Sequence, residues 1–184
     1  MKKTIYLFAL VTFGLFMNSC SSDDDSGSDN VIGSFLKIDD NKTDFVLGIA
    51  EDYGAYNEEG EEGIYNIDLS LLSTGFTFED QELNGTGIGI YFEIFSSTPN
   101  KLAPGVYEYD ANAQTALIFD DATLFEYTED EEKEIDLVSG TITIIKSEIG
   151  YYELTFNGED ELGRVISGSF SGNVEYIKEI EEED

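Results

Sequence analysis

The chain contains no histidine, no tryptophan and a single cysteine, Cys20. Without histidine, the serine–histidine and cysteine–histidine pairs of common hydrolases cannot form. The usual nitrogen and sulfur ligands of zinc and copper are missing as well. Neither a phosphate-binding loop ending in lysine and serine or threonine nor a dinucleotide fingerprint occurs. We therefore expect no catalytic residues, no metal and no cofactor, and predict that the chain is not an enzyme.

Basic side chains are also scarce, with 9 lysines and arginines against 40 acids and a formal net charge of −31. A field of this sign repels the phosphates of nucleic acids and anionic membrane surfaces. Binding to DNA or RNA is thereby excluded. The charge is explained most simply as a solvated surface.

The N-terminus has the three parts of an export signal. Lys2 and Lys3 precede an uncharged run from Ile5 to Phe16. As a helix, twelve residues span about 18 Å, well short of the ~30 Å hydrocarbon core of a bilayer. A basic start and a short apolar segment predict a signal peptide over residues 1–19, rather than a buried helix of the domain.

The residues Met17-Asn18-Ser19-Cys20 resemble a lipobox, the site at which a cysteine is lipidated. Lipidation explains why an exported chain has a single, unpaired cysteine. A free thiol buried in the core is the alternative, but a core would not accept the polar segment from Ser21 to Asp25 that follows Cys20. The serine-then-acid stretch is also similar to the export signal of Bacteroidota surface lipoproteins. That resemblance implies an outer-membrane lipoprotein anchored through Cys20 at the cell surface, with a periplasmic orientation left open.

The rest of the mature chain divides into three parts. Residues 20–30 form the lipidated cysteine and a flexible acidic tether, residues 31–178 a β domain, and residues 179–184 an acidic tail. Aromatic residues make up 13% of the chain, which favours a packed core over disorder. A domain of about 150 residues is large enough for one stable core.

Apolar and polar residues alternate with a period of two through most of the β domain. The clearest runs are Tyr65–Leu71, Ile88–Phe95 and Val165–Tyr176, and shorter candidate strands cover 33–38, 44–50, 105–110, 116–120, 122–127, 138–146 and 150–157. The pairs Asn84-Gly85 and Asn157-Gly158 predict hairpin turns, and Pro104-Gly105 opens a strand. Glu129–Glu134 fits either one helical turn or a solvated loop.

This pattern predicts an all-β fold, either a single antiparallel β-sandwich or an up-and-down barrel of roughly 8–10 strands. Three segments, Pro104–Asp110, Ser139–Ile144 and Gly163–Gly172, resemble recurring pieces of small Bacteroidota lipoproteins. The resemblance implies an antiparallel β domain and transfers no functional residue.

Carboxylates are the chemical groups that remain. Glu93 and Glu153 each interrupt an apolar strand, and we expect both to face solvent on the polar side. Asp39–Asp44 begins like a calcium loop, but position six is Asp44 and position twelve is Ala50, so it is not an EF-hand. Calcium binding by carboxylates of the acidic runs 58–62, 120–121 and 129–132 is the alternative to the absence of a metal.

Tyr53 and Tyr56 flank Gly54 in a polar stretch and are the two candidate ligand-binding residues. Exposed tyrosine rings stack on sugars and anchor protein contacts. The leading hypothesis is a non-enzymatic binding or accessory module at the cell surface, with a glycan or a surface protein as partner. The alternative is a carboxylate-dependent glycoside hydrolase acting on extracellular polysaccharide.

Overall fold

The computed structural model describes residues 33–56, 63–112 and 115–178, which consist of strands and connecting turns. The all-β prediction is confirmed over these residues. The predicted signal peptide (1–19), Cys20 with its tether (20–30) and the acidic tail (179–184) lie outside the described residues.

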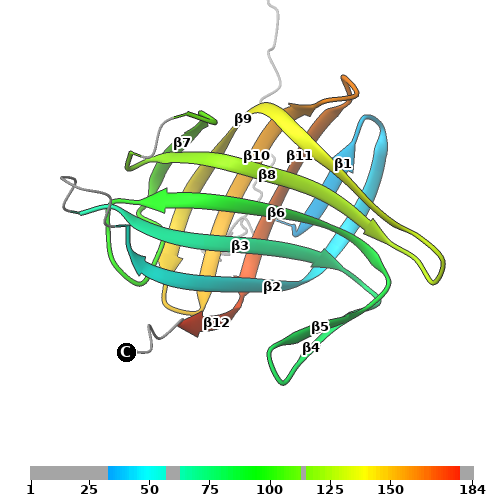
Figure 1. The fold of residues 1–184 in the computed structure, drawn as a ribbon, viewed down its shortest axis with the longest axis horizontal. Helices are drawn as coiled ribbons and strands as arrows, with labels where there is room; N and C mark the ends of the chain where they lie inside the picture. Colours follow the sequence, from blue (N-terminus) through cyan, green and yellow to red (C-terminus); the bar gives the residue numbers. More distant parts are fainter. Residues whose placement is uncertain (1–32, 57–62, 113–114, 179–184) are drawn as a thin grey trace, which may run out of the picture.

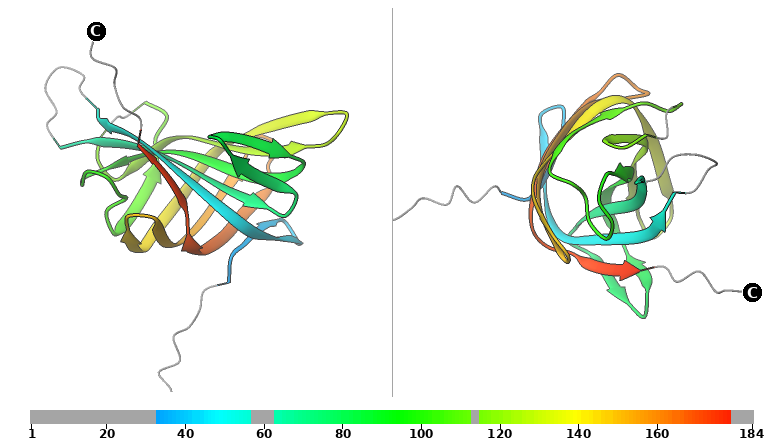
Figure 2. Two further views of the ribbon diagram at one scale, coloured as in Figure 1. Left: turned by 90° about the horizontal axis from the view of Figure 1, so that it is seen from below. Right: turned by 90° about the vertical axis from the view of Figure 1, so that its left-hand side faces the viewer.

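Eight strands pair in chain order, each antiparallel to the next, as in an up-and-down barrel (Figure 1). They are β1 (Phe35–Ile38), β2 (Asn41–Ala55), β3 (Tyr65–Ser73), β6 (Gly87–Ser96), β8 (Ile118–Tyr127), β9 (Glu132–Glu148), β10 (Tyr151–Asp160) and β11 (Val165–Asn173). Because β1 also pairs with β11, the sheet closes on itself. The right-hand view of Figure 2 looks into the resulting ring.

Four further strands are added to this ring. β7 (Gly105–Tyr109) pairs antiparallel with β9 and parallel with β8, and β12 (Glu175–Lys178) pairs parallel with β2. β4 (Phe76–Glu79) and β5 (Glu82–Gly85) form a separate hairpin. The two parallel pairings depart from the purely antiparallel prediction, and the β4–β5 hairpin was missed.

The interior of the barrel is filled by apolar side chains that alternate along the strands. Phe92 lies at its centre, with ring centroids 5.3 Å from Phe156 and 5.9 Å from Phe119. An eight-stranded barrel has an interior about wide enough for side chains to fill. All of this core comes from residues 36–174, so we expect the domain to fold without the N-terminal segment.

One end of the barrel is closed by the connection between β6 and β7. The Ser96 hydroxyl donates to the Lys101 carbonyl at 2.8 Å and accepts from the Ala103 amide at 3.0 Å. This holds Leu102 fully buried against the core. The opposite end, where the β1–β2 and β8–β9 hairpins turn, is called the mouth below.

A second apolar cluster lies on the outer face of the sheet. Phe76 of the β4–β5 hairpin is buried in this cluster together with Leu72, Phe125 and Ile49. Its ring meets that of Phe125 edge-on at 6.0 Å. The hairpin therefore covers outward-facing apolar residues near the mouth that alternation alone assigns to solvent.

The prediction of a hairpin at Asn157-Gly158 is wrong. Both residues lie inside β10, where Gly158 pairs with Gly140 of β9. Gly158 does not adopt a positive φ, which the tight turn requires. A Cβ on Gly158 would lie 2.4 Å from the Ser139 carbonyl oxygen, so glycine permits close approach of two strands here.

The prediction at Asn84-Gly85 is also wrong, because the turn lies at the other end of β5. Asp80 and Gln81 make it, with φ of 55° and 63°. The candidate strands 116–120 and 122–127 are one strand, β8, with an irregularity opposite Glu93 and Ile94. Glu129–Glu134 is not helical, since the Thr128 amide donates to the Glu131 carbonyl at 2.9 Å and β9 starts at Glu132.

Candidate functional site

A pocket of about 250 Å³ lies on the outer face of the barrel, over β2, β3 and β6. It is called the tyrosine pocket, and its lining residues are Tyr53, Gly54, Ala55, Tyr56, Asn66, Asp68 and Glu93. Both tyrosines that sequence selected therefore line one pocket. The expectation that they bind a ligand stays a prediction.

A bulge in β2 positions the first tyrosine. The register with β3 shifts between Asp52 and Gly54, and Gly54 has a φ of 85°. The buried Asp52 carboxylate accepts a hydrogen bond from the Gly54 amide at 2.9 Å. Tyr53, within this bulge, turns outward and is 46% exposed. Bulges commonly re-aim a side chain in this way.

The second tyrosine follows directly after β2 and is fixed by two contacts. The Tyr56 amide donates to the Ile64 carbonyl at 2.9 Å. Its ring stands edge-on to Phe95, with centroids 5.2 Å apart at 83°. Phe95 is fully buried, so the Tyr56 ring has a rigid support.

Beside the tyrosines, four carboxylates lie directly opposite one another on adjacent strands. Glu51 of β2 pairs with Asp68 of β3, Asp68 with Glu93 of β6, and Glu93 with Asp121 of β8. We call these residues the acidic row. Like charges directly opposite in a sheet are destabilising. The row therefore raises the free energy of the folded chain and concentrates negative potential at the pocket.

Asp68 is the most perturbed member of the row. The Tyr91 hydroxyl donates to Asp68 Oδ2 at 2.5 Å, while Asp68 Oδ1 is buried and has no hydrogen-bond partner in the part of the chain that the structure describes. Burial raises the pKa of Asp68 to about 7, although the hydrogen bond from Tyr91 opposes this shift. Burial also raises the pKa of Tyr91 far above its usual value. Near neutral pH, Asp68 can therefore act either as a hydrogen-bond donor or as an acceptor.

Glu93 lies next to Asp68 and shares the pocket. The Asn66 side-chain amide donates to Glu93 Oε1 at 3.1 Å. Burial, followed by repulsion from Asp120 and Asp121, raises the pKa of the Glu93 carboxyl above its usual range. Glu93 is on the outward polar side of β6, as expected, but it is half-buried rather than free in solvent.

Glu153, the other acid selected from the sequence, does not join this site. It lies on β10, opposite Lys146 and Ser171. Sequence reasoning missed Asn66 and Asp68 as site residues. Their only signal was their polar position in the alternating run Tyr65–Leu71, which does not reveal what faces them across the sheet.

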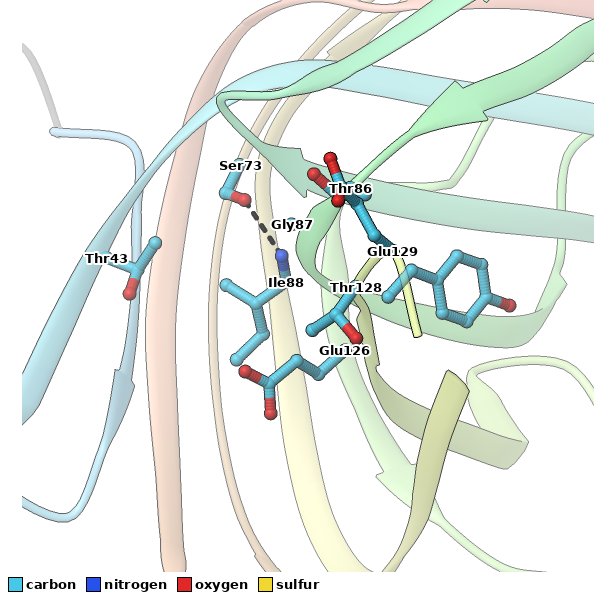
Figure 3. Close-up of a pocket in the computed structure, with 9 residues that line it drawn as sticks. Thr43, Ser73, Thr86, Gly87, Ile88, Glu126, Thr128 and Glu129 are labelled. Atoms are coloured by element: carbon cyan, nitrogen blue, oxygen red, sulfur yellow. Dashed lines mark hydrogen bonds between the residues drawn. The ribbon is translucent and has the colours of Figure 1, made fainter. Parts of the chain in front are cut away.

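A second, larger hollow of about 440 Å³ lies at the mouth (Figure 3). It is called the mouth pocket, and its lining residues are Thr43, Ser73, Thr86, Gly87, Ile88, Glu126, Tyr127, Thr128 and Glu129. The Ser73 hydroxyl accepts a hydrogen bond from the Ile88 amide at 2.9 Å. Sequence reasoning named none of these residues as a site, except that Glu129 belongs to one of the acidic runs.

Among the described residues, no group of three or more acids is arranged to hold a metal ion. Asp39 and Asp40 form the β1–β2 turn, and Asp39 Oδ1 accepts a hydrogen bond from the Val165 amide at 3.0 Å. The acidic run 58–62 falls outside the described residues. Calcium binding by that run stays an untested prediction.

No protein-family model, curated protein or solved structure matches this chain. Across the residues that the structure describes, no helix has the length and apolar character needed to span a membrane.

Proposed function

We propose that the chain is a lipoprotein of the outer membrane, anchored through Cys20, whose β domain is a non-enzymatic binding module at the cell surface. The favoured partner is a glycan, and a surface protein is the other candidate. The N-terminal signal, the lone cysteine and the acidic tether support the anchoring.

One juxtaposition supports glycan binding, namely two tyrosine rings beside three hydrogen-bonding side chains in the tyrosine pocket. A sugar ring offers an apolar face for stacking and hydroxyl groups for hydrogen bonds. Tyr53 and Tyr56 supply the aromatic surface, and Asn66, Asp68 and Glu93 supply donors and acceptors. Because the acidic row repels anions, neutral glycans are favoured over uronic-acid or sulfated ones.

A glycan array followed by calorimetry on the mature chain tests this proposal. We expect Tyr53→Ala to weaken binding of a hit by about tenfold, since a lost stacking contact costs roughly 1–2 kcal/mol. The matched control is Tyr151→Ala, a partly buried tyrosine of β10 away from the pocket. If no glycan on the array binds, capture of surface proteins by the wild type and by Tyr53→Ala is compared. Equal capture by both, together with the empty array, would reject the tyrosine pocket as a binding site.

The glycoside hydrolase is kept as a second candidate because Asp68 and Glu93 lie opposite each other in one pocket. Directly opposed residues place their Cβ atoms about 4.5–5.5 Å apart, near the carboxyl spacing of about 5–5.5 Å in retaining enzymes. Asp68, with a pKa of about 7, fits the general acid, and Glu93 the nucleophile.

Turnover separates the two candidates. A hydrolase releases reducing ends from a polysaccharide and loses this activity in both Asp68→Asn and Glu93→Gln. A binding module retains the polysaccharide without cleaving it. If both variants release as much product as the wild type does, the activity comes from a contaminating enzyme.

A further inference from the structure

A third cavity lies at the mouth, inside the ring of strands, and is separate from the tyrosine pocket. It has a volume of about 60 Å³, and its lining residues are Ile38, Ile88, Leu124, Phe125, Glu126, Lys133, Ile135 and Arg164. We call it the arginine cavity. It shares Ile88 and Glu126 with the mouth pocket, so the two hollows adjoin.

Arg164 is the only arginine of the chain, and it is held in place. Its Nε donates to Asp160 Oδ2 at 2.7 Å. Asp160 is 1% exposed, and its Oδ1 accepts the backbone amides of Leu162 at 3.0 Å and Arg164 at 2.9 Å. The carboxylate is thus fixed by the backbone, and it fixes the guanidinium in turn.

Nη2 of Arg164 is buried and has no hydrogen-bond partner among the described residues, so its N–H groups remain available to a ligand. A buried donor without a partner costs free energy, and more so when the group is charged. A carboxylate entering the cavity would supply that partner after a small shift of the neighbouring side chains. Planar guanidinium groups match carboxylates particularly well.

Lys133 brings a second positive charge to the same cavity. It is exposed, and it forms no ion pair with the described residues. Glu126 lies directly opposite Lys133 in the β8–β9 register, so one acid also borders the cavity. Two cations at one small cavity stand out in a chain with 40 acids.

The other walls are apolar. Ile38, Ile88 and Ile135 come from three different strands, and Leu124 and Phe125 complete the surface. We propose that the mouth binds a compact organic anion, namely a carboxylate on an apolar body. The carboxylate pairs with Arg164 and Lys133, the body contacts the isoleucines, and any longer part extends into the mouth pocket.

Amide chemical-shift titration of residues 21–184 tests this site, with hexanoate as the probe. Hexanamide keeps the body without the charge, and acetate keeps the charge without the body. We expect hexanoate to bind with millimolar affinity and to shift the amides of Ile38, Lys133 and Arg164. Each comparison ligand should bind at least about fivefold more weakly, because it lacks one of the two interactions.

Two variants locate the binding. Lys133→Gln removes an exposed charge without touching the core and should weaken hexanoate by about fivefold. Arg164→Lys keeps a cation near Asp160 but loses the Nη2 group that would bind the carboxylate. This variant should weaken binding by about tenfold. Lys146→Gln is the control, because Lys146 lies on β9 like Lys133 but does not line the cavity. This variant, and Tyr53→Ala in the tyrosine pocket, should bind hexanoate as the wild type does.

Three outcomes would overturn the proposal. The first is the absence of any shift at tens of millimolar hexanoate. The second is equal binding of hexanoate and hexanamide, which would mean that the charge is not recognised. The third is equal binding of hexanoate, acetate and inorganic phosphate with no effect of Lys133→Gln, which would mean an adventitious ion only.

Discussion

Replacing Asp68 by asparagine should remove a large part of the pH dependence of stability. Asparagine has the same shape and can still accept the hydrogen bond from the Tyr91 hydroxyl, but it cannot ionise. In the wild type, burial raises the pKa of Asp68 from 3.8 to about 7 in the folded state. The folded chain therefore holds the proton more tightly than the unfolded chain does.

The sign follows from this difference. Below the unfolded pKa, Asp68 is protonated in both states and costs no stability. As the pH rises toward the folded pKa of about 7, the unfolded state gains from ionisation first, so the wild type loses stability over that range. A shift of about three units corresponds to roughly 4 kcal/mol, and partial solvent contact reduces this to about 2 kcal/mol.

Urea unfolding of both proteins at about pH 4 and about pH 8 measures the effect. The free energy of unfolding of Asp68→Asn, relative to the wild type, should rise by about 2 kcal/mol between the two pH values. Taking the difference cancels the repulsion among the other acids, which both proteins share. Glu153→Gln, on β10 and away from the acidic row, is the control for the loss of one carboxylate elsewhere on the sheet.

A relative stability of Asp68→Asn that does not change with pH would refute this reasoning. It would mean that the Asp68 carboxyl is solvated in the folded state, despite the burial of its Oδ1. A wild type that gains stability over Asp68→Asn at higher pH would mean that an unseen cation neutralises the acidic row.

Three further substitutions test the fold by urea unfolding. Gly168→Ala should cost about 2–3 kcal/mol, because a Cβ there would lie 2.3 Å from Cζ of Phe156. Phe76→Ala should cost about 3 kcal/mol by leaving a cavity in the outer apolar cluster, and unchanged stability would show that Phe76 does not help to hold the β4–β5 hairpin on the barrel. Tyr176→Phe should cost roughly 1–3 kcal/mol, because the buried Asp52 carboxylate loses the hydroxyl that donates to it; a loss below this range would show that the bond does not help to hold β12.

The strands themselves were predictable from local sequence. The alternating run Tyr65–Leu71 became β3, Ile88–Phe95 became β6, and Val165–Tyr176 spans β11 and the first half of β12. A period of two reports directly which residues can share the buried face of a strand. The hairpin turns were less predictable, because Asn157-Gly158 is equally suited to a turn and to a close strand contact, and packing against Gly140 decided between them.

The candidate site was predictable only in part. Tyr53 and Tyr56 were visible as aromatic residues in a polar stretch, and they line one pocket. Asn66 and Asp68 were not, because each is one polar residue among several in a strand. Their role depends on the register with β6, which brings Asp68 opposite Glu93, 25 positions away in the chain.

By itself, the sequence determined the all-β class, the faces of the main strands and the strong negative charge, because each follows from composition or from short-range alternation. Only the tertiary structure decided between sandwich and barrel, since closure depends on β1 pairing with β11 across the whole domain. The same long-range pairing aligned four carboxylates on adjacent strands and left Asp68 Oδ1 and Arg164 Nη2 buried without hydrogen-bond partners within residues 33–56, 63–112 and 115–178. Such placements depend on register between distant segments, which no local pattern encodes.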